Sequence, residues 1–214
     1  MAGSLVESAL HDRAAPGLRL IETLRREGGG YVRLERHLAR LGQSAEWLGW
    51  TCDLGRVMAA LMAVAVQDAR VRLTLDGAGV VAVQSSALPA AAAEWQVGLA
   101  AARLASDDPW LGVKSSNRAV HDAARAALPP GLDEMVFQNQ RGEVCDGTIT
   151  TLFFDRGQGM RTPPLTCGLL PGVLRAEMLA AGCLEEVLMA EDLPKVRLWV
   201  GNSLRGLMRA VWVG

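Results

Sequence analysis

Lysine is almost missing from this chain of 214 residues. Of the 22 basic side chains, only Lys114 and Lys195 are lysines, and the others are arginines. Arginine stays protonated and cannot act as an amine nucleophile, whereas a lysine in a dry pocket can lose its proton. Lys114 follows a mostly apolar segment that begins at Trp110, and three small polar residues come after the lysine. We therefore interpret Lys114 as the carrier of a Schiff base; a solvated surface lysine is the plain alternative.

Other scarce features exclude whole classes of function. The four cysteines are scattered, without a C-x-x-C pair or a histidine cluster, which argues against a zinc site or a disulfide framework and fits a reducing compartment. With a net charge of −1 and no basic stripe, nucleic acid is not an expected partner. The longest apolar run, Val57–Val66, has about half the length that a membrane helix needs. The N-terminal residues lack a basic n-region and an apolar h-region, so we expect no signal peptide and a soluble, cytoplasmic protein.

The first part of the chain, residues 1–105, is predicted to form a small α+β domain. Residues 1–16 show no periodicity and are interpreted as a loose lead-in. Alternating and helical hydrophobic patterns follow in mixed order. They predict strands at 17–25, 31–34, 70–76, 80–84 and 95–102, a helix at 34–48, and a second helix that Asp53 caps and that includes Val64.

The second part, residues 106–214, is predicted to form a larger C-terminal domain that carries Lys114. The segment 106–109 is interpreted as the crossing between the domains. The patterns predict helices at 118–127 and 173–181, strands at 134–139 and 197–201, a terminal strand, and a long strand region at 144–154 interrupted at Asp146. The fold class expected is therefore a two-domain mixture of α+β and α/β structure.

Several polar features could serve one ligand together with the lysine. Asp146 interrupts an apolar strand beside Gly147, so it is either a turn residue or a buried carboxylate with a cationic partner. The glycine-flanked stretch 168–172 runs into a helix, where the backbone N–H groups of Val173 and Leu174 could point at an anion. Ser203 follows a hydrophobic strand, a position where a hydroxyl can bind phosphate. Taken singly, each also fits an ordinary turn or helix start.

Arg40 completes this set. It lies beside leucines on the inner face of the helix predicted at 34–48, so it is either partly buried and in need of an anion or part of a solvated face. A lysine, a carboxylate, an arginine and a helix start are what pyridoxal phosphate requires. The lysine holds its aldehyde, the carboxylate keeps its pyridine nitrogen protonated, and the rest hold its phosphate.

Competing motifs are weak. The glycines after Asp76 form a hairpin turn and not a dinucleotide loop, because no helix follows them. The sequence has no G-x-S-x-G or Walker motif. The histidines at 11, 37 and 121 are too widely spaced to suggest a metal site, and His37 is interpreted as orienting a helix.

The chain resembles the class IV (fold type IV) pyridoxal-phosphate enzymes, a family with a two-domain fold like that of D-amino-acid aminotransferase. Within the family it is most similar to the 4-amino-4-deoxychorismate lyases. Singly the matching stretches are weak, but together they span nearly the whole chain in the family's order. They are residues 20–25, 36–41 with 44–45, 114–120, 133–134, 142–148, 162–172 and 202–206.

The resemblance implies an active site between the domains and a homodimer. It also implies that Lys114 binds the cofactor covalently, that Asp146 faces the pyridine nitrogen and that Leu170 packs on the ring. The phosphate would be held by Arg40, Ser203 and the backbone of Val173 and Leu174. The reaction implied is loss of pyruvate to give 4-aminobenzoate, a folate precursor, with functional coupling to an aminodeoxychorismate synthase.

Two residues depart from the family's pattern. Asp146 stands where glutamate is usual, which predicts a contact to the nitrogen that is long or bridged by water. Thr151 stands where many relatives carry asparagine. Two stretches, Asn117–Arg118 and Asn202–Leu204, favour the lyase over a class IV aminotransferase for branched-chain or D-amino acids, and a catalytically weakened relative is a third alternative. Arg25, Asn117 and Arg118 are the candidates for binding substrate carboxylates.

Overall fold

The computed structural model describes Leu10 and residues 16–214, so most of the predicted lead-in lies outside the described residues. The chain divides into two compact units. The first runs to Ala90 and also holds Val113–Asn117, and the second comprises Ala91–Gly112 and Arg118–Gly214. This division differs from the boundary expected at residue 105, and it groups Lys114 with the first unit. Backbone hydrogen bonds between the lysine segment and the first strand account for the grouping.

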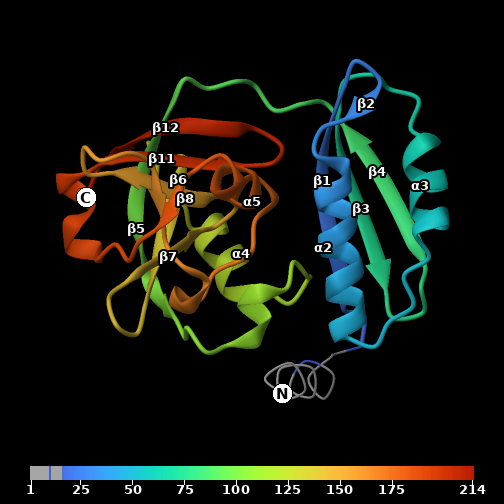
Figure 1. The fold of residues 1–214 in the computed structure, drawn as a ribbon, viewed down its shortest axis with the longest axis horizontal. Coiled ribbons are helices and arrows are strands. Elements are labelled where there is room, and N and C mark those ends of the chain that lie inside the picture. The colour runs from blue at the N-terminus through green and yellow to red at the C-terminus, as the bar shows by residue number, and fades with distance from the viewer. Residues whose placement is uncertain (1–9, 11–15) are drawn as a thin grey trace. The chain divides into compact units, whose positions relative to one another are not determined.

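The first unit is built on a four-stranded antiparallel sheet with the order β2-β1-β3-β4. Its strands are β1 (Arg19–Glu27), β2 (Gly30–Tyr31), β3 (Ala69–Asp76) and β4 (Val81–Ser86). Strict alternation along β3 buries Ala69, Val71, Leu73 and Leu75, as the sequence pattern predicted. Helix α2 (Leu34–Trp47) packs against β1, and α3 (Leu54–Met62) contacts β4 (Figure 1).

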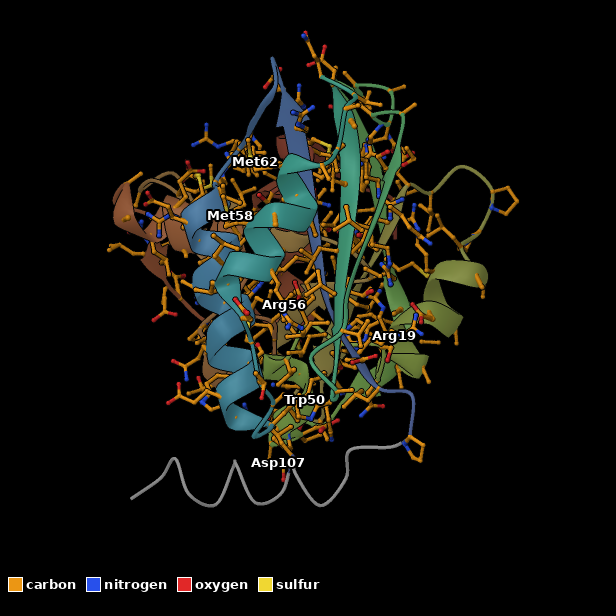
Figure 2. All side chains as sticks on the ribbon, turned by 90° about the vertical axis from the view of Figure 1, so that its right-hand side faces the viewer. Arg19, Trp50, Arg56, Met58, Met62 and Asp107 are labelled. Atoms are coloured by element: carbon orange, nitrogen blue, oxygen red, sulfur yellow. The ribbon has the colours of Figure 1, made fainter. Side chains whose placement is uncertain are left out.

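Each of the two helices buries the side chains along one narrow face. In α2 the buried residues include His37, Leu41 and Ala45, at helical spacing. Asp53 caps α3 by accepting a hydrogen bond from the N–H of Arg56 at 3.1 Å, as predicted. Val57 and Leu61 face inward on α3, whereas Met62 is exposed; Figure 2 shows Met58 and Met62 one turn apart along this helix.

Two details of this unit differ from the sequence prediction. The partner strand expected at 31–34 is only the two-residue strand β2. It is short because Arg33 adopts a left-handed conformation (φ 59°), which directs the chain into α2. Helix α3 ends at Met62, two residues before Val64, which was expected to be helical.

The second unit is built on an eight-stranded mixed sheet with the order β10-β9-β8-β11-β12-β5-β6-β7. Strand β5 is parallel to both of its neighbours, β12 and β6, whereas the pairs β6–β7, β8–β11 and β11–β12 are antiparallel. The strands are β5 (Glu94–Leu104), β6 (Glu134–Asn139), β7 (Val144–Gly147), β8 (Thr151–Asp155), β9 (Arg161–Thr162), β10 (Leu184–Glu185), β11 (Arg197–Asn202) and β12 (Gly206–Trp212).

Short helices complete the second unit, namely α4 (Ala119–Ala126), α5 (Val173–Ala180) and the 3₁₀ turns η1 (Pro109–Gly112), η2 (Leu165–Cys167) and η3 (Ala190–Lys195). Its main core includes Val136, Leu152, Phe154 and Val200, all fully buried. The interrupted strand region expected at 144–154 consists of two strands, β7 and β8. The break between them follows Gly147, in a tight turn in which the N–H of Gly147 donates to the carbonyl of Thr150 at 2.7 Å. Among the described residues, no helix has the length and apolar character to span a membrane.

Candidate active site

The two lysines have different surroundings. Lys195 is 63% exposed and donates to Asp192 at 2.8 Å, and this hydrogen bond raises the pKa of Lys195. An amine held protonated in an exposed ion pair is a poor nucleophile. Lys114 instead lies on a half-buried segment that pairs with the N-terminal part of β1. Of the two, only Lys114 has a setting that suits covalent chemistry.

Backbone hydrogen bonds fix Lys114 against β1. Its carbonyl accepts from the N–H of Ile21 at 2.8 Å, and the N–H of Ser116 donates to the carbonyl of Arg19 at 2.8 Å. Ser115 is directly opposite Leu20 in this antiparallel bridge. Since opposite residues share a face, Lys114 lies on the other face of β1, with Ile21, Thr23 and Arg25. The candidate lysine and the substrate-binding candidate Arg25 therefore share one strand face.

A buried ionic cluster joins β1 to α2. The Glu22 carboxylate accepts two hydrogen bonds from Arg40, Nε to Oε1 at 2.9 Å and Nη2 to Oε2 at 2.6 Å, and Nδ1 of His37 lies 2.6 Å from Oε2. Burial opposes ionisation of Glu22, but the charge of Arg40 and the hydrogen bonds outweigh it and lower the pKa of this carboxyl to about 2. Arg40 is thus partly buried with an anion, one of the two alternatives that its position allowed.

The substrate-binding candidates have identifiable partners. Arg25 donates to Glu27, with Nη2 to Oε1 at 2.8 Å. The N–H of Asn117 donates to Oγ of Ser115 at 3.2 Å. Arg118 belongs to the second unit, where Nε donates to Asp122 at 2.7 Å and Nη2 donates to the carbonyl of Thr148 at 2.7 Å. Arg118 therefore ties the start of α4 to the turn between β7 and β8.

Asp146 is a buried carboxylate and not a surface turn residue. It lies in β7, whose four residues are all buried, and its Oδ2 accepts a hydrogen bond from the N–H of Leu170 at 3.2 Å. The fold thus brings together two candidates that are 24 residues apart in the chain. Because a carboxylate away from water needs donors, this arrangement suits one that faces a protonated ring nitrogen.

The N-terminus of α5 is available to an anion. No side chain caps it, its first turn contains no acidic residue, and Gly172 precedes it in an extended conformation (φ −65°, ψ 143°). Val173 and Leu174, the first two helical residues, are buried. Backbone N–H groups at a helix start that lack a side-chain cap bind phosphate well.

The end of β11, which precedes Ser203, packs closely against a side chain of α5. A Cβ on Gly201 would lie 2.6 Å from Cδ2 of Leu174 on α5 and 2.7 Å from the backbone carbonyl oxygen of Gly206 in β12, so only glycine fits at this position. Ser203 itself is buried, two residues further on. Asn202 stabilises this loop by accepting hydrogen bonds from the N–H groups of Leu204 and Arg205 at 3.1 and 3.0 Å.

Sequence reasoning did not identify two acidic residues that organise these sites. Glu22 is the anion that Arg40 was expected to need, and the signal was its inward position between Leu20 and Leu24 on β1. Glu134, at the start of β6, is fully buried and accepts hydrogen bonds from the turn that follows Asp146. Among the described residues, no group of histidine, cysteine and acidic side chains is placed to hold a metal ion.

The second unit holds a buried carboxylate, a helix start without a side-chain cap and a buried hydroxyl, and the first unit holds Lys114. Groups of these kinds are what pyridoxal-phosphate enzymes use to hold their cofactor. The chain belongs to the amino-transferase class IV family, whose model matches residues 19–211. The resemblance, fold class and cofactor predicted from the sequence are therefore confirmed.

Individual relatives carry more specific names. A Schizosaccharomyces pombe protein, provisionally named an aminodeoxychorismate lyase, is 30% identical over 175 residues, which are 78% of this chain and 75% of that protein. A Mesorhizobium loti structure, provisionally named an amino-acid aminotransferase, is 42% identical with a TM-score of 0.87, covering 92% of this chain and all of that one. The 4-amino-4-deoxychorismate lyase of Pseudomonas aeruginosa is 25% identical with a TM-score of 0.79, covering 91% and 82%.

Proposed function

We propose that this enzyme is a 4-amino-4-deoxychorismate lyase, which releases pyruvate and leaves 4-aminobenzoate. The observation that carries the proposal is the similarity, over three quarters of its length, to the S. pombe protein of that provisional name. The lyase structure from P. aeruginosa supports it, since it covers nearly all of this chain.

The residues described above fit the cofactor. Lys114 would bind it covalently, and Asp146 would face its ring nitrogen while Leu170 packs on the ring. The phosphate would take its hydrogen bonds from Arg40, Ser203 and the N–H groups at the start of α5. Glu22 accepts hydrogen bonds from Nε and Nη2 of Arg40, so it would orient the guanidinium.

Bound pyridoxal phosphate supplies an electron sink for the pair of electrons left when a C–H bond next to the substrate's amine breaks. Lys114 would take that proton as general base and later return a proton as general acid. The bond between the ring carbon and the enolpyruvyl oxygen would break, the departing enolpyruvate would take up a proton and tautomerise to pyruvate, and the ring would become aromatic. No oxidant or reductant is consumed. Asp146 would keep the sink effective by stabilising the proton on the ring nitrogen.

The substrate carries two carboxylates, which suit cationic and amide side chains. We assign this role to Arg25, which shares a strand face with Lys114, and to Asn117, which is three residues after the lysine. Arg118 would bind a carboxylate in addition to the carbonyl of Thr148 that it already contacts. We further infer a homodimer in the cytoplasm, acting in folate biosynthesis on the product of an aminodeoxychorismate synthase.

The test is a product assay with the purified protein and its cofactor. Aminodeoxychorismate should yield 4-aminobenzoate, read by its fluorescence, and pyruvate, read by coupled reduction to lactate, in equal amounts. Lys114→Ala should yield neither. Cofactor-loaded protein that forms no 4-aminobenzoate would refute the lyase.

An aminotransferase is the second candidate, and the similarity to the M. loti protein favours it. An aminotransferase transfers the amine to the cofactor, so adding a branched-chain or D-amino acid alone would convert the absorbance of the aldehyde form into that of the amine form. A lyase leaves the amine on its aromatic product. The two activities are therefore distinguished by whether the amino group stays on the cofactor or leaves with the product.

A further inference from the structure

The turn that follows Asp146 is wrapped around one carboxylate. We name residues 146–151 the Asp146 loop; it joins the end of β7 to the start of β8. Glu134, the first residue of β6, is fully buried beneath it. We propose that Glu134 is a positioning residue that fixes Asp146 by holding this loop, an inference that rests on the cofactor role proposed above for Asp146.

The hydrogen bonds of Glu134 go almost entirely to the loop. Oε1 accepts from the N–H of Thr148 at 3.0 Å and from its hydroxyl, and Oε2 accepts from the N–H of Ile149 at 3.2 Å and the hydroxyl of Thr150 at 2.8 Å. The fifth bond comes from the N–H of Met135 at 3.0 Å. Glu134 is the acceptor in all five, which suits a carboxylate and no neutral side chain.

All five of these donors are uncharged. The guanidinium of Arg125 is the cation near Glu134, with Nη1 3.8 Å from Oε1, but this nitrogen donates to the carbonyl of Asp133 at 2.6 Å. A carboxylate removed from water is costly unless hydrogen bonds replace its hydration. Because the loop supplies most of those bonds, the carboxylate and the loop conformation depend on each other.

The loop is packed too tightly to adopt another shape around Glu134. A Cβ on Gly147 would lie 2.5 Å from Oγ1 of Thr150 and 2.9 Å from Oε2 of Glu134, so the backbone next to Asp146 runs directly over the carboxylate. The outward carbonyls are also bound, that of Thr148 by Arg118 at 2.7 Å and that of Ile149 by Asn202 at 3.1 Å. Glu134 thus acts as the inner anchor, and its neighbours hold the outer side.

Position matters because Asp146 is one methylene shorter than glutamate. A short side chain cannot reach its partner by changing rotamer, so its placement depends on the backbone that carries it. That backbone continues directly into Gly147 and the residues bound by Glu134. A loosened loop should therefore move the carboxylate away from the ring nitrogen and weaken cofactor binding.

The first experiment reads the loop itself, without the cofactor. Glu134→Gln replaces one acceptor oxygen by a donor that faces the N–H of Thr148 or Ile149. Hydrogen exchange of the purified protein, followed by mass spectrometry, should then rise by about tenfold or more in peptides that cover residues 148–150. The matched control is Asp155→Asn, because Asp155 also caps a turn, accepting from the N–H groups of Gly157 and Gly159 at 2.6 and 3.0 Å. Asp155→Asn should raise exchange only at residues 157–159. If Glu134→Gln exchanges at residues 148–150 as slowly as the wild type does, the proposal is wrong.

The second experiment connects the loop to the cofactor. Binding of pyridoxal phosphate is titrated for Asp146→Asn, Glu134→Gln and the double variant. We expect Glu134→Gln to weaken binding by about tenfold to a hundredfold, as is usual when a residue that orients a ligand-binding side chain is lost. The double variant should bind no more weakly than Asp146→Asn, because both changes act through one carboxylate. Effects that multiply would contradict the inference.

The outcomes separate this inference from the proposed function. If Asp146→Asn binds the cofactor as the wild type does, the cofactor role of Asp146 is wrong and the positioning role falls with it, even where the exchange data show that Glu134 holds the loop. If Asp146→Asn is impaired while Glu134→Gln loosens the loop but binds normally, only the positioning role is wrong.

Should Glu134→Gln not fold, Thr148→Val removes one hydroxyl donor, and Thr148→Ser restores it. The valine variant should loosen the loop and weaken binding, and the serine variant should do neither; equal behaviour of the two would count against the proposal.

Discussion

The acid stability of the first unit should depend on Glu22. Its pKa is about 2 in the folded protein against an ordinary value of 4.5, so its ionised form is favoured by folding. At about 1.4 kcal/mol for each factor of ten in a protonation equilibrium, this difference corresponds to roughly 3 kcal/mol of folding free energy at pH 7. The sign follows from the depressed pKa: the contribution is present above pH 4.5 and is lost as the pH falls toward 2. At pH 3, about 1.4 kcal/mol of it should remain.

Glu22→Gln removes this titration and leaves the guanidinium of Arg40 buried without its anion. Loss of one partner of a buried pair typically costs about 3–5 kcal/mol, so the variant should be strongly destabilised at pH 7. Urea unfolding measured at pH 7, 5, 4 and 3 should show the gap between wild type and variant shrinking by about 2 kcal/mol as the wild type loses its carboxylate. The control is Glu27→Gln, which removes an exposed carboxylate from the same strand. A gap that stays constant with pH would refute the reasoning.

Three further outcomes are expected. Borohydride reduction should attach the cofactor covalently to wild type and Lys195→Ala but not to Lys114→Ala, as intact mass will show; attachment at Lys195 would overturn the assignment. Gly201→Ala should destabilise the protein by about 1–3 kcal/mol and weaken phosphate binding, because its Cβ would meet Leu174 at 2.6 Å. The control is Gly157→Ala, which has open space at its Cβ and therefore tests backbone strain without a steric clash. Asp146→Glu should retain cofactor absorbance if the loop admits the extra methylene, whereas Asp146→Asn should weaken binding by at least about tenfold, which titration of absorbance measures.

The elements that the sequence predicted well are those with strong periodicity. Strand β3 alternates without exception, and α2 and α5 begin where the hydrophobic spacing changes. The grouping of Val113–Asn117 with the first unit was not predictable, because nothing in the local pattern of that segment announces a pairing with β1 more than ninety residues earlier. Likewise, β9 and β10 are two-residue strands whose pairing is fixed by their neighbours and not by propensity.

Glu22 and Glu134 differ in how far a sequence can reveal a buried carboxylate. Glu22 shares the inward face of β1 with Leu20 and Leu24, and two basic groups follow at a helical spacing of three in His37 and Arg40. An acid at an inward strand position and a matched pair of cations on the next helix together predict a buried ion pair. That inference needs only strand parity and helix geometry.

Glu134 offers no such signal, because its partners are backbone N–H groups and threonine hydroxyls. Every residue except proline supplies a backbone donor, so no residue type marks where these donors will converge. Their convergence depends on the turn between β7 and β8, and that turn is held in shape by the same carboxylate. The conformation of the loop and the burial of Glu134 depend on each other, so the local sequence around either one does not predict how Asp146 is positioned.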